Sequence, residues 1–192
     1  MLVIPKNSNN IFTILGIDPG STLLGIALLF VNIDTLQIVG SNAWTINGAK
    51  LAGKDTWSDE LYGNRVSRIL AIEETLVNTF NYYQPLIISC ESPFINSAFP
   101  AAGIALTEVL STIRSAVMRY DVWHQLYLIP PSSVKNAVGA KGAAGKDSVK
   151  EKVLELDLKY NGDVPIQSLD EHSLDALAVA YSIYCTKVLG KI

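Results

Sequence analysis

Two apolar segments that a short turn separates dominate the start of the chain. Residues 14–30 read ILGIDPGSTLLGIALLF, and only Asp18 and the polar residues after it interrupt the apolar run. Apolar runs on either side of a Pro-Gly turn are typical of two adjacent antiparallel strands. The segment LQIVGSNAW, residues 36–44, continues the pattern, so the sequence predicts a three-stranded antiparallel unit.

The spacing of apolar residues changes after residue 59. They recur at steps of three and four, as expected for an amphipathic helix, at Tyr62, Val66, Ile69, Ile72, Leu76 and Phe80. Residues 85–91, PLIISCE, form a short apolar run of the buried-strand type, and residues 101–120 show the helical spacing again. The sequence therefore predicts helix, strand and helix in this region.

The last third of the chain predicts one more strand and three more helices. QLYLIP is a fifth short strand, PSSVKNAV is a helix with proline near its start, and residues 146–160 are helical after a glycine-rich loop. The final helix begins near Ser168, where Ser168 and Glu171 fit a capping box. The order βββ-α-β-α-β-α-α predicts an α/β fold: a mixed five-stranded sheet, its first three strands antiparallel, with helices on both faces.

Composition supports one ordered domain. The chain has 192 residues, of which 49% are hydrophobic and 17% charged. We expect a flexible segment over residues 1–10 and a single domain over 11–192. The longest apolar stretch is far short of the roughly 20 residues that span a bilayer. Cys90 and Cys185 lack CxxC spacing and are expected to be reduced core thiols in a cytoplasmic protein with no membrane contact.

Carboxylates at the ends of two apolar strands suggest a site. Asp18 ends the first strand and Glu91 the fourth, where a carboxylate is costly unless it is paired, hydrogen-bonded or bound to metal. His172 and Asp175 are three residues apart and share one face of the last helix. If the four converge, they suit Mg²⁺ or Mn²⁺, and two such ions about 3.5–4 Å apart can hydrolyse a phosphodiester.

Each of these residues also has a simpler interpretation. Asp18 before Pro-Gly can shape a turn, and Glu91 can be a surface residue at a strand end. Asp170, Glu171 and even Asp175 can complement the positive end of a helix, and His172 alone is more often a hydrogen-bonded or solvated histidine than a ligand.

Charge is unevenly distributed along the chain. The net charge is −3, which argues weakly against nucleic acid as a partner, but residues 135–152 hold five lysines against two acids. The GK pair in this segment is not a phosphate-binding P-loop. Ala140 replaces the required glycine, and Asp147 stands where Ser or Thr must bind Mg²⁺.

Four motifs, in this order, resemble those of RuvC-type Holliday junction resolvases: GIDPGS, ESPF, VKNAVGAKGAAGKDSVKEKV and HSLDALAVA. The resemblance covers nearly the whole chain. It implies a ribonuclease H-like fold and a homodimer that cuts four-way DNA junctions with divalent metal, Mg²⁺ or Mn²⁺, two ions per active site. The family's metal-binding positions correspond to Asp18, Glu91, His172 and Asp175. The family carries either Asp or His at the position of His172, so this side chain can be a ligand or can act as the base on the attacking water.

The resemblance also implies DNA contacts and a dimer helix. Lys135 and Lys146 match basic residues near the cut strand. Lys141 either contacts the DNA backbone or is solvated. Phe94 matches an aromatic residue that the family places near the junction crossover. Alternatively, Phe94 is a loop residue that packs into the hydrophobic core. The helix over residues 101–120 corresponds to the dimer helix. Residues 42–57 form a longer segment than in the family, interpreted as a loop that touches junction arms.

Three other functions compete with a junction resolvase. An ATPase of the actin and sugar-kinase group has a similar phosphate loop, but needs two such domains and a second loop. A nuclease for flaps, forks or other branched DNA keeps the fold and changes the substrate, as phage relatives of the family can. A binding module without activity would leave several costly ionisable groups without a role.

Overall fold

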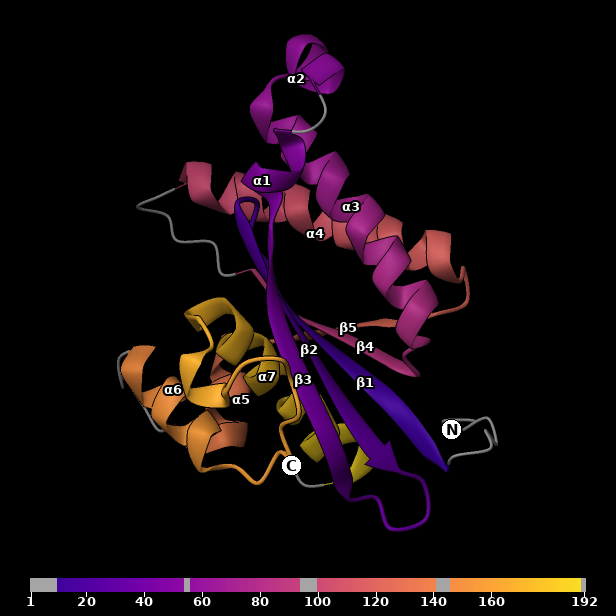
Figure 1. The fold of residues 1–192 in the computed structure, drawn as a ribbon, viewed down its shortest axis with the longest axis vertical. Helices are drawn as coiled ribbons and strands as arrows, with labels where there is room; N and C mark the ends of the chain where they lie inside the picture. The colour runs from indigo at the N-terminus through magenta and orange to yellow at the C-terminus, as the bar shows by residue number, and fades with distance from the viewer. Residues whose placement is uncertain (1–9, 54–55, 94–99, 141–145, 191–192) are drawn as a thin grey trace.

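A five-stranded mixed sheet forms the centre of the computed structural model, which describes residues 10–53, 56–93, 100–140 and 146–190 (Figure 1). The strand order is β3-β2-β1-β4-β5. Strands β1 (Ile11–Asp18), β2 (Leu23–Asn32) and β3 (Ile38–Asn47) are antiparallel. Strands β4 (Ile87–Glu91) and β5 (Leu126–Ile129) extend the sheet in parallel to β1. The predicted mixed sheet is therefore confirmed. The segment expected to be flexible, apart from Asn10, lies outside the described residues.

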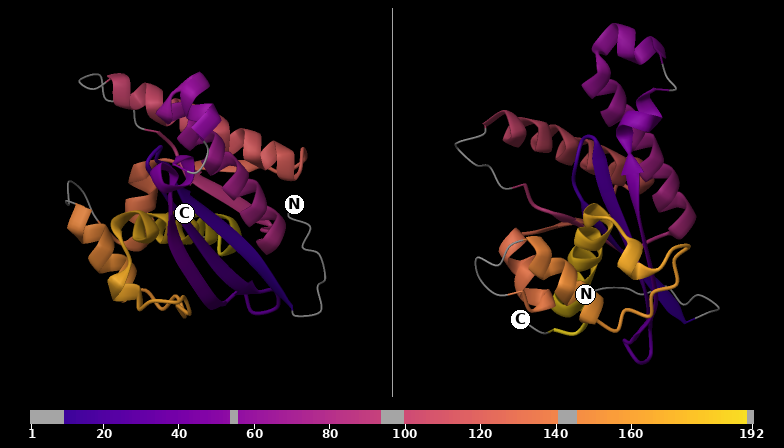
Figure 2. Two further views of the ribbon diagram at one scale, coloured as in Figure 1. Left: turned by 45° about the horizontal axis from the view of Figure 1, so that its top comes forward. Right: turned by 60° about the vertical axis from the view of Figure 1, so that its left-hand side comes forward.

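Alternating side chains of each strand give the sheet two apolar faces. In β1, Leu15 and Ile17 pack against α3 (Asn64–Tyr83) and α4 (Pro100–Tyr120). Ile14 faces the other way, toward α5 (Pro131–Val138), α6 (Lys146–Glu155) and α7 (Glu171–Ile183). Helix α7 packs directly on β1 and β2, and α5 and α6 pack against α7 (Figure 2). Residues on the α7 face of the sheet are thus in position to form a site with α7.

The segment before α3 differs from the prediction. Residues 42–57, expected to be a loop, include the end of β3, α1 (Gly48–Ala52) and the start of α2 (Thr56–Tyr62). The two helices project beyond the sheet (Figure 1). Gly63, with φ 79°, separates α2 from α3. The apolar stripe predicted across this break is wrong at its start, because Tyr62 and Val66 are exposed and burial becomes continuous only from Ile72 onward. Contact of this projection with DNA stays a prediction.

Two further helix boundaries differ from the sequence-based expectation. Helix α6 ends at Glu155 rather than at Tyr160, because the chain turns to pair with the edge of the sheet. The backbone N–H of Ser41 donates to Lys159, and that of Asn161 donates to Ser41. Helix α7 is preceded by a short 3-10 turn, Ile166–Ser168, and begins at Glu171 rather than near Ser168.

Both cysteines are buried, as expected for core thiols. Over the described ranges, no helix is long and apolar enough to cross a membrane.

Candidate active site

The two strand-end carboxylates lie side by side at one end of the sheet. Asp18 is the last residue of β1, and Glu91 follows the paired residues Ile17 and Cys90 at the end of β4. Because side chains alternate along a strand, Asp18 shares with Ile14 the face that α7 covers. The Asp18 side chain is only 13% exposed, so its charge lies in partly desolvated surroundings.

Two glycines allow α7 to approach the sheet closely enough to complete the site. A Cβ atom on Gly25 of β2 would lie 2.0 Å from the carbonyl oxygen of His172, and one on Gly16 of β1 would lie 2.5 Å from that of Ala176. Both distances are too short for any side chain, so the helix lies directly on the strand backbones. As a result, Nδ1 of His172 lies 2.7 Å from Oδ2 of Asp18.

Asp175 completes the cluster from the same face of α7. Burial and, to a lesser extent, the negative charges of Asp18 and Asp175 raise the pKa of Glu91 to about 7, although the nearby Lys135 acts to lower it. Mutual influence of this kind requires the three carboxyl groups to share one electrostatic environment. The four residues singled out in the sequence are therefore neighbours; their roles stay a prediction.

The donor set has the chemistry of a divalent-metal site. Three carboxylates and one imidazole are ligands that Mg²⁺ and Mn²⁺ accept, and a cation would oppose the burial and the repulsion that together hold the pKa of Glu91 high. In the conformation described here, His172 contacts Asp18 directly. Among the described residues, no group of three or more His, Cys, Asp or Glu side chains is already arranged to hold an ion. The residues fit the metal chemically.

A hydrogen-bonded cluster outside the sequence prediction fixes the start of α7. Asp170 is the N-cap residue: its carboxylate accepts hydrogen bonds from the backbone N–H of Ser173 and from the hydroxyl of Thr45 in β3. Burial raises the pKa of Asp170, but these hydrogen bonds outweigh that effect and keep it below its usual value. This agrees with the helix-end role expected for Asp170 and replaces Ser168 as the cap.

The comparisons with known proteins agree with this geometry. The sequence profile of the family "Crossover junction endodeoxyribonuclease RuvC" matches residues 14–182. This chain belongs to the RuvC family. RuvC proteins of Rickettsia conorii and Dehalococcoides mccartyi (strain 195) are each 28% identical to it, over 91% and 93% of this chain and 98% and 96% of their own lengths.

Solved structures support the same fold. Thermus thermophilus RuvC in complex with a Holliday junction substrate aligns with a TM-score of 0.66, at 17% identity, over 94% of this chain and 97% of its own. The yeast mitochondrial Holliday junction resolvase Ydc2 aligns with a TM-score of 0.60, at 14% identity, over 89% and 77%. The ribonuclease H-like architecture is thereby confirmed, and the actin and sugar-kinase interpretation is set aside. RuvC-family nucleases are metal-dependent, in agreement with the donor set.

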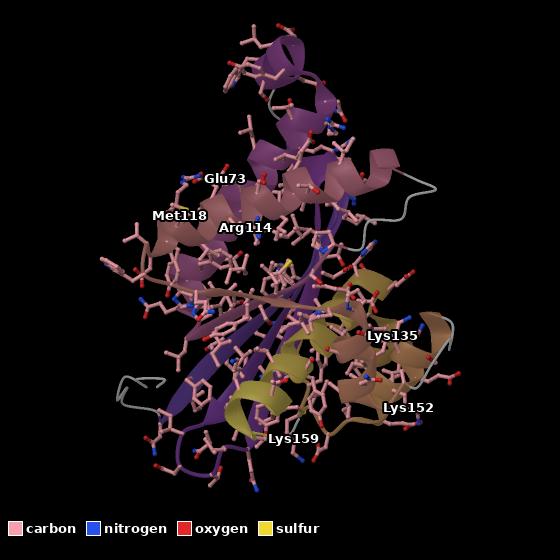
Figure 3. The ribbon with its side chains drawn as sticks, turned by 180° about the vertical axis from the view of Figure 1, so that it is seen from behind. Glu73, Arg114, Met118, Lys135, Lys152 and Lys159 are labelled. Atoms are coloured by element: carbon pink, nitrogen blue, oxygen red, sulfur yellow. The ribbon has the colours of Figure 1, made fainter. Side chains whose placement is uncertain are left out.

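Of the RuvC-type DNA contacts inferred from the resemblance, the structure describes one side chain. Lys135 of α5, which is labelled in Figure 3, is partly buried. It lies close enough to Glu91 to lower the pKa of that carboxyl group. Lys146 begins α6, but its side chain is not among the described ones. Phe94 and Lys141 lie outside the described residues.

Sequence reasoning missed Thr45, Gly16 and Gly25. The glycines carried a signal, since glycine inside an apolar strand often marks close approach of another backbone. A single threonine in a strand carries none.

Proposed function

We propose that this protein is a structure-selective endonuclease that resolves four-way DNA junctions by paired, metal-dependent hydrolysis of phosphodiesters. The observation that carries the proposal is the convergence of Asp18, Glu91, His172 and Asp175 where α7 crosses the sheet. Membership of the RuvC family supports the same activity and the same substrate class.

The four side chains would hold Mg²⁺, with Mn²⁺ as a substitute, as two ions in each active site. Bound ions of this kind activate a water and stabilise the leaving oxygen of a phosphodiester. Contact of Nδ1 of His172 with Asp18 leaves Nε2 as the ring nitrogen that faces a metal or water. The exchange of His for Asp in the family favours a ligand role for His172, since a carboxylate can replace imidazole as a ligand.

Positive charge beside the carboxylates would position the DNA strand. Lys135 lies within electrostatic range of Glu91, where it can hold a phosphate next to the acidic cluster. The resemblance adds Lys141, Lys146 and Phe94 as further DNA contacts. The substrate in this proposal is branched DNA, chiefly the four-way junction.

Paired cuts require two active sites, and α4 offers a surface for a second copy of the chain. Exposed residues recur along one side of α4 at steps of three and four: Ile104, Thr107, Ser111, Arg114 and Met118. This row, here called the α4 stripe, carries a single charge, and Figure 3 shows Arg114 and Met118 along the helix. Small and apolar exposed side chains at this spacing suit close packing of two helices. We propose the α4 stripe as the homodimer contact.

Cleavage of synthetic DNA tests the proposal. A four-way junction, a flap, a fork and a linear duplex would be incubated with the protein in Mg²⁺ and in Mn²⁺, beside Asp18→Asn, which keeps the size of the side chain and removes its charge. We expect symmetric paired nicks in the junction with the wild type and none with Asp18→Asn. Equal cutting of flaps and forks would favour a general branched-DNA nuclease. Junction binding without cutting of any substrate would favour a binding module.

A further inference from the structure

Three residues from three adjacent strands form a row beneath the first turn of α7. Asp18 of β1 is paired with Gly25 of β2, and Gly25 is paired with Thr45 of β3. Side chains at paired positions lie on the same face of a sheet, so Asp18 and Thr45 flank Gly25 on the face that α7 covers. The carbonyl oxygen of His172 lies directly over Gly25. The helix is therefore held between a carboxylate on one side and a hydroxyl on the other.

The contacts on the Thr45 side form a closed ring of hydrogen bonds. The hydroxyl oxygen of Thr45 lies 2.6 Å from Oδ1 of Asp170 and 2.9 Å from Oγ of Ser173. The backbone N–H of Ser173 donates to the same Oδ1 of Asp170, at 2.9 Å. Thr45 can thus donate to the carboxylate and accept from the serine hydroxyl, which satisfies all three groups. Ser173 is 1% exposed, so its side of the ring is shielded from water, whereas Asp170 lies at the surface.

We propose that Thr45 and Asp170 are positioning residues that hold His172 in register with Asp18. The inference rests on the proposed function of the Asp18 and His172 site. Capping of the helix needs only the bond between Asp170 and Ser173. The bond from Thr45 adds a tie from the helix start to the sheet on the side opposite Asp18. Loss of this tie leaves the cap in place and lets the first turn of α7 move relative to Asp18, and displacements of about 1 Å at such sites reduce catalysis strongly.

Two substitutions distinguish the effect of the Thr45 hydroxyl from the effect of the side chain's shape. Thr45→Val keeps the branched side chain that suits a strand and removes the hydroxyl, whereas Thr45→Ser keeps the hydroxyl and removes a methyl. We expect Thr45→Val to lower kcat for junction cleavage about 10- to 100-fold, the range typical of groups that orient metal ligands, with junction affinity within about twofold of wild type. Thr45→Ser should restore kcat to within about threefold. Equal loss in both variants, or no loss in Thr45→Val, would overturn the proposal.

A second readout does not depend on cleavage. The chain has two histidines, and His124 lies just before β5, at the end of the sheet opposite Asp18. In metal-free protein, NMR of the imidazole groups should show His172 resonances shifted in Thr45→Val and in Thr45→Ala, near wild type in Thr45→Ser, and His124 unchanged in all three. If the His172 resonances are not shifted in Thr45→Val and Thr45→Ala, the positioning role is refuted. If the wild type cuts no DNA, the proposed function fails, and the imidazole signals still decide this inference.

Discussion

Nδ1 of His172 lies 2.7 Å from Oδ2 of Asp18, although 154 positions separate the two residues in the chain. The contact joins the last helix to the first strand and exists because glycines in β1 and β2 let the helix lie on the sheet. It fixes which nitrogen of the imidazole meets Asp18, and the proposed function assigns the other, Nε2, to a metal or water.

Substitutions of His172 distinguish a role as a metal ligand from a role as a general base. His172→Asp should keep junction cleavage within about tenfold of wild type, because a carboxylate can take the place of imidazole on Mg²⁺. His172→Ala should lower the rate of junction cleavage at least about 100-fold. Cleavage rates in Mg²⁺ measure both, with His124→Ala as a matched control that should behave as wild type. If His172→Asp is as inactive as His172→Ala, His172 acts as the base.

Glu91 should make the metal-free protein less stable as pH rises. Its pKa of about 7 in the folded state lies above the ordinary value of 4.5, so the folded state binds the proton more tightly than the unfolded state. The free energy of unfolding should therefore fall between about pH 4.5 and pH 7, by up to about 3 kcal/mol in total, and level off above pH 7. Urea unfolding in EDTA at pH 5 and pH 8 measures the change.

Glu91→Gln is the control for this pH effect, because the amide does not titrate. The variant should lose most of the difference between pH 5 and pH 8. Mg²⁺ added at pH 8 should stabilise the wild type more than the variant, since the cation offsets repulsion among the carboxylates. An equal slope in both proteins would show that another group titrates.

Gly25 should tolerate no side chain. Gly25→Ala places a Cβ 2.0 Å from the carbonyl oxygen of His172, so α7 must shift. We expect a loss of about 2–3 kcal/mol in the free energy of unfolding, together with loss of cleavage. Gly53→Ala is the control, since its Cβ would meet Ala49 at an ordinary 3.6 Å and its φ is −64°. Urea unfolding should place the control at or slightly above wild-type stability.

Lys135 should contribute to DNA binding through charge. Lys135→Ala should reduce the magnitude of the slope of log affinity against log salt by about 1, as expected for one lost phosphate contact. Lys187→Ala removes the same charge in the helical turn that follows the C-terminal end of α7, beside Tyr127, and should leave the slope unchanged. Fluorescence anisotropy of a labelled junction at several salt concentrations, with Ca²⁺ in place of Mg²⁺, measures the slope for each variant. Equal effects of the two variants would indicate a non-local contribution of net charge.

The α4 stripe should control the oligomeric state. Ile104 and Met118 are 59% and 63% exposed, so Ile104→Glu and Met118→Glu should leave the fold intact while placing charge in a helix–helix contact. Light scattering after size exclusion should show a dimer for wild type and a monomer for either variant. Tyr82→Glu alters a more exposed side chain on α3, at 79%, and should stay dimeric. Dimers in all variants would place the contact elsewhere.

The sheet and its strand-end carboxylates were predictable because they depend on local patterns. Apolar runs around the Pro-Gly turn indicated β1 and β2, and the placement of Asp18 and Glu91 at strand ends followed directly. Helical spacing placed His172 and Asp175 on one face. Each of these inferences needed only neighbours in the sequence.

Two of the three errors have their physical origin in tertiary contacts, and the third in a backbone turn. Asp170 rather than Ser168 caps α7, because Thr45 from another strand supports that carboxylate. Helix α6 stops early because the chain pairs with Ser41 instead of continuing. The first helix was drawn through Gly63 because side-chain spacing continued across a backbone turn that the apolar pattern does not report.

The pairing of residues 159–161 with β3 also bears on how the protein behaves in a concentrated solution. Strand β3 is an edge strand of the sheet. Unpaired edge strands can pair with strands from other molecules and start aggregation. At Ser41 the chain supplies its own partner, in hydrogen bonds with Lys159 and Asn161. The shortened helix thus leaves the chain enough length to shield part of its own sheet margin from intermolecular pairing.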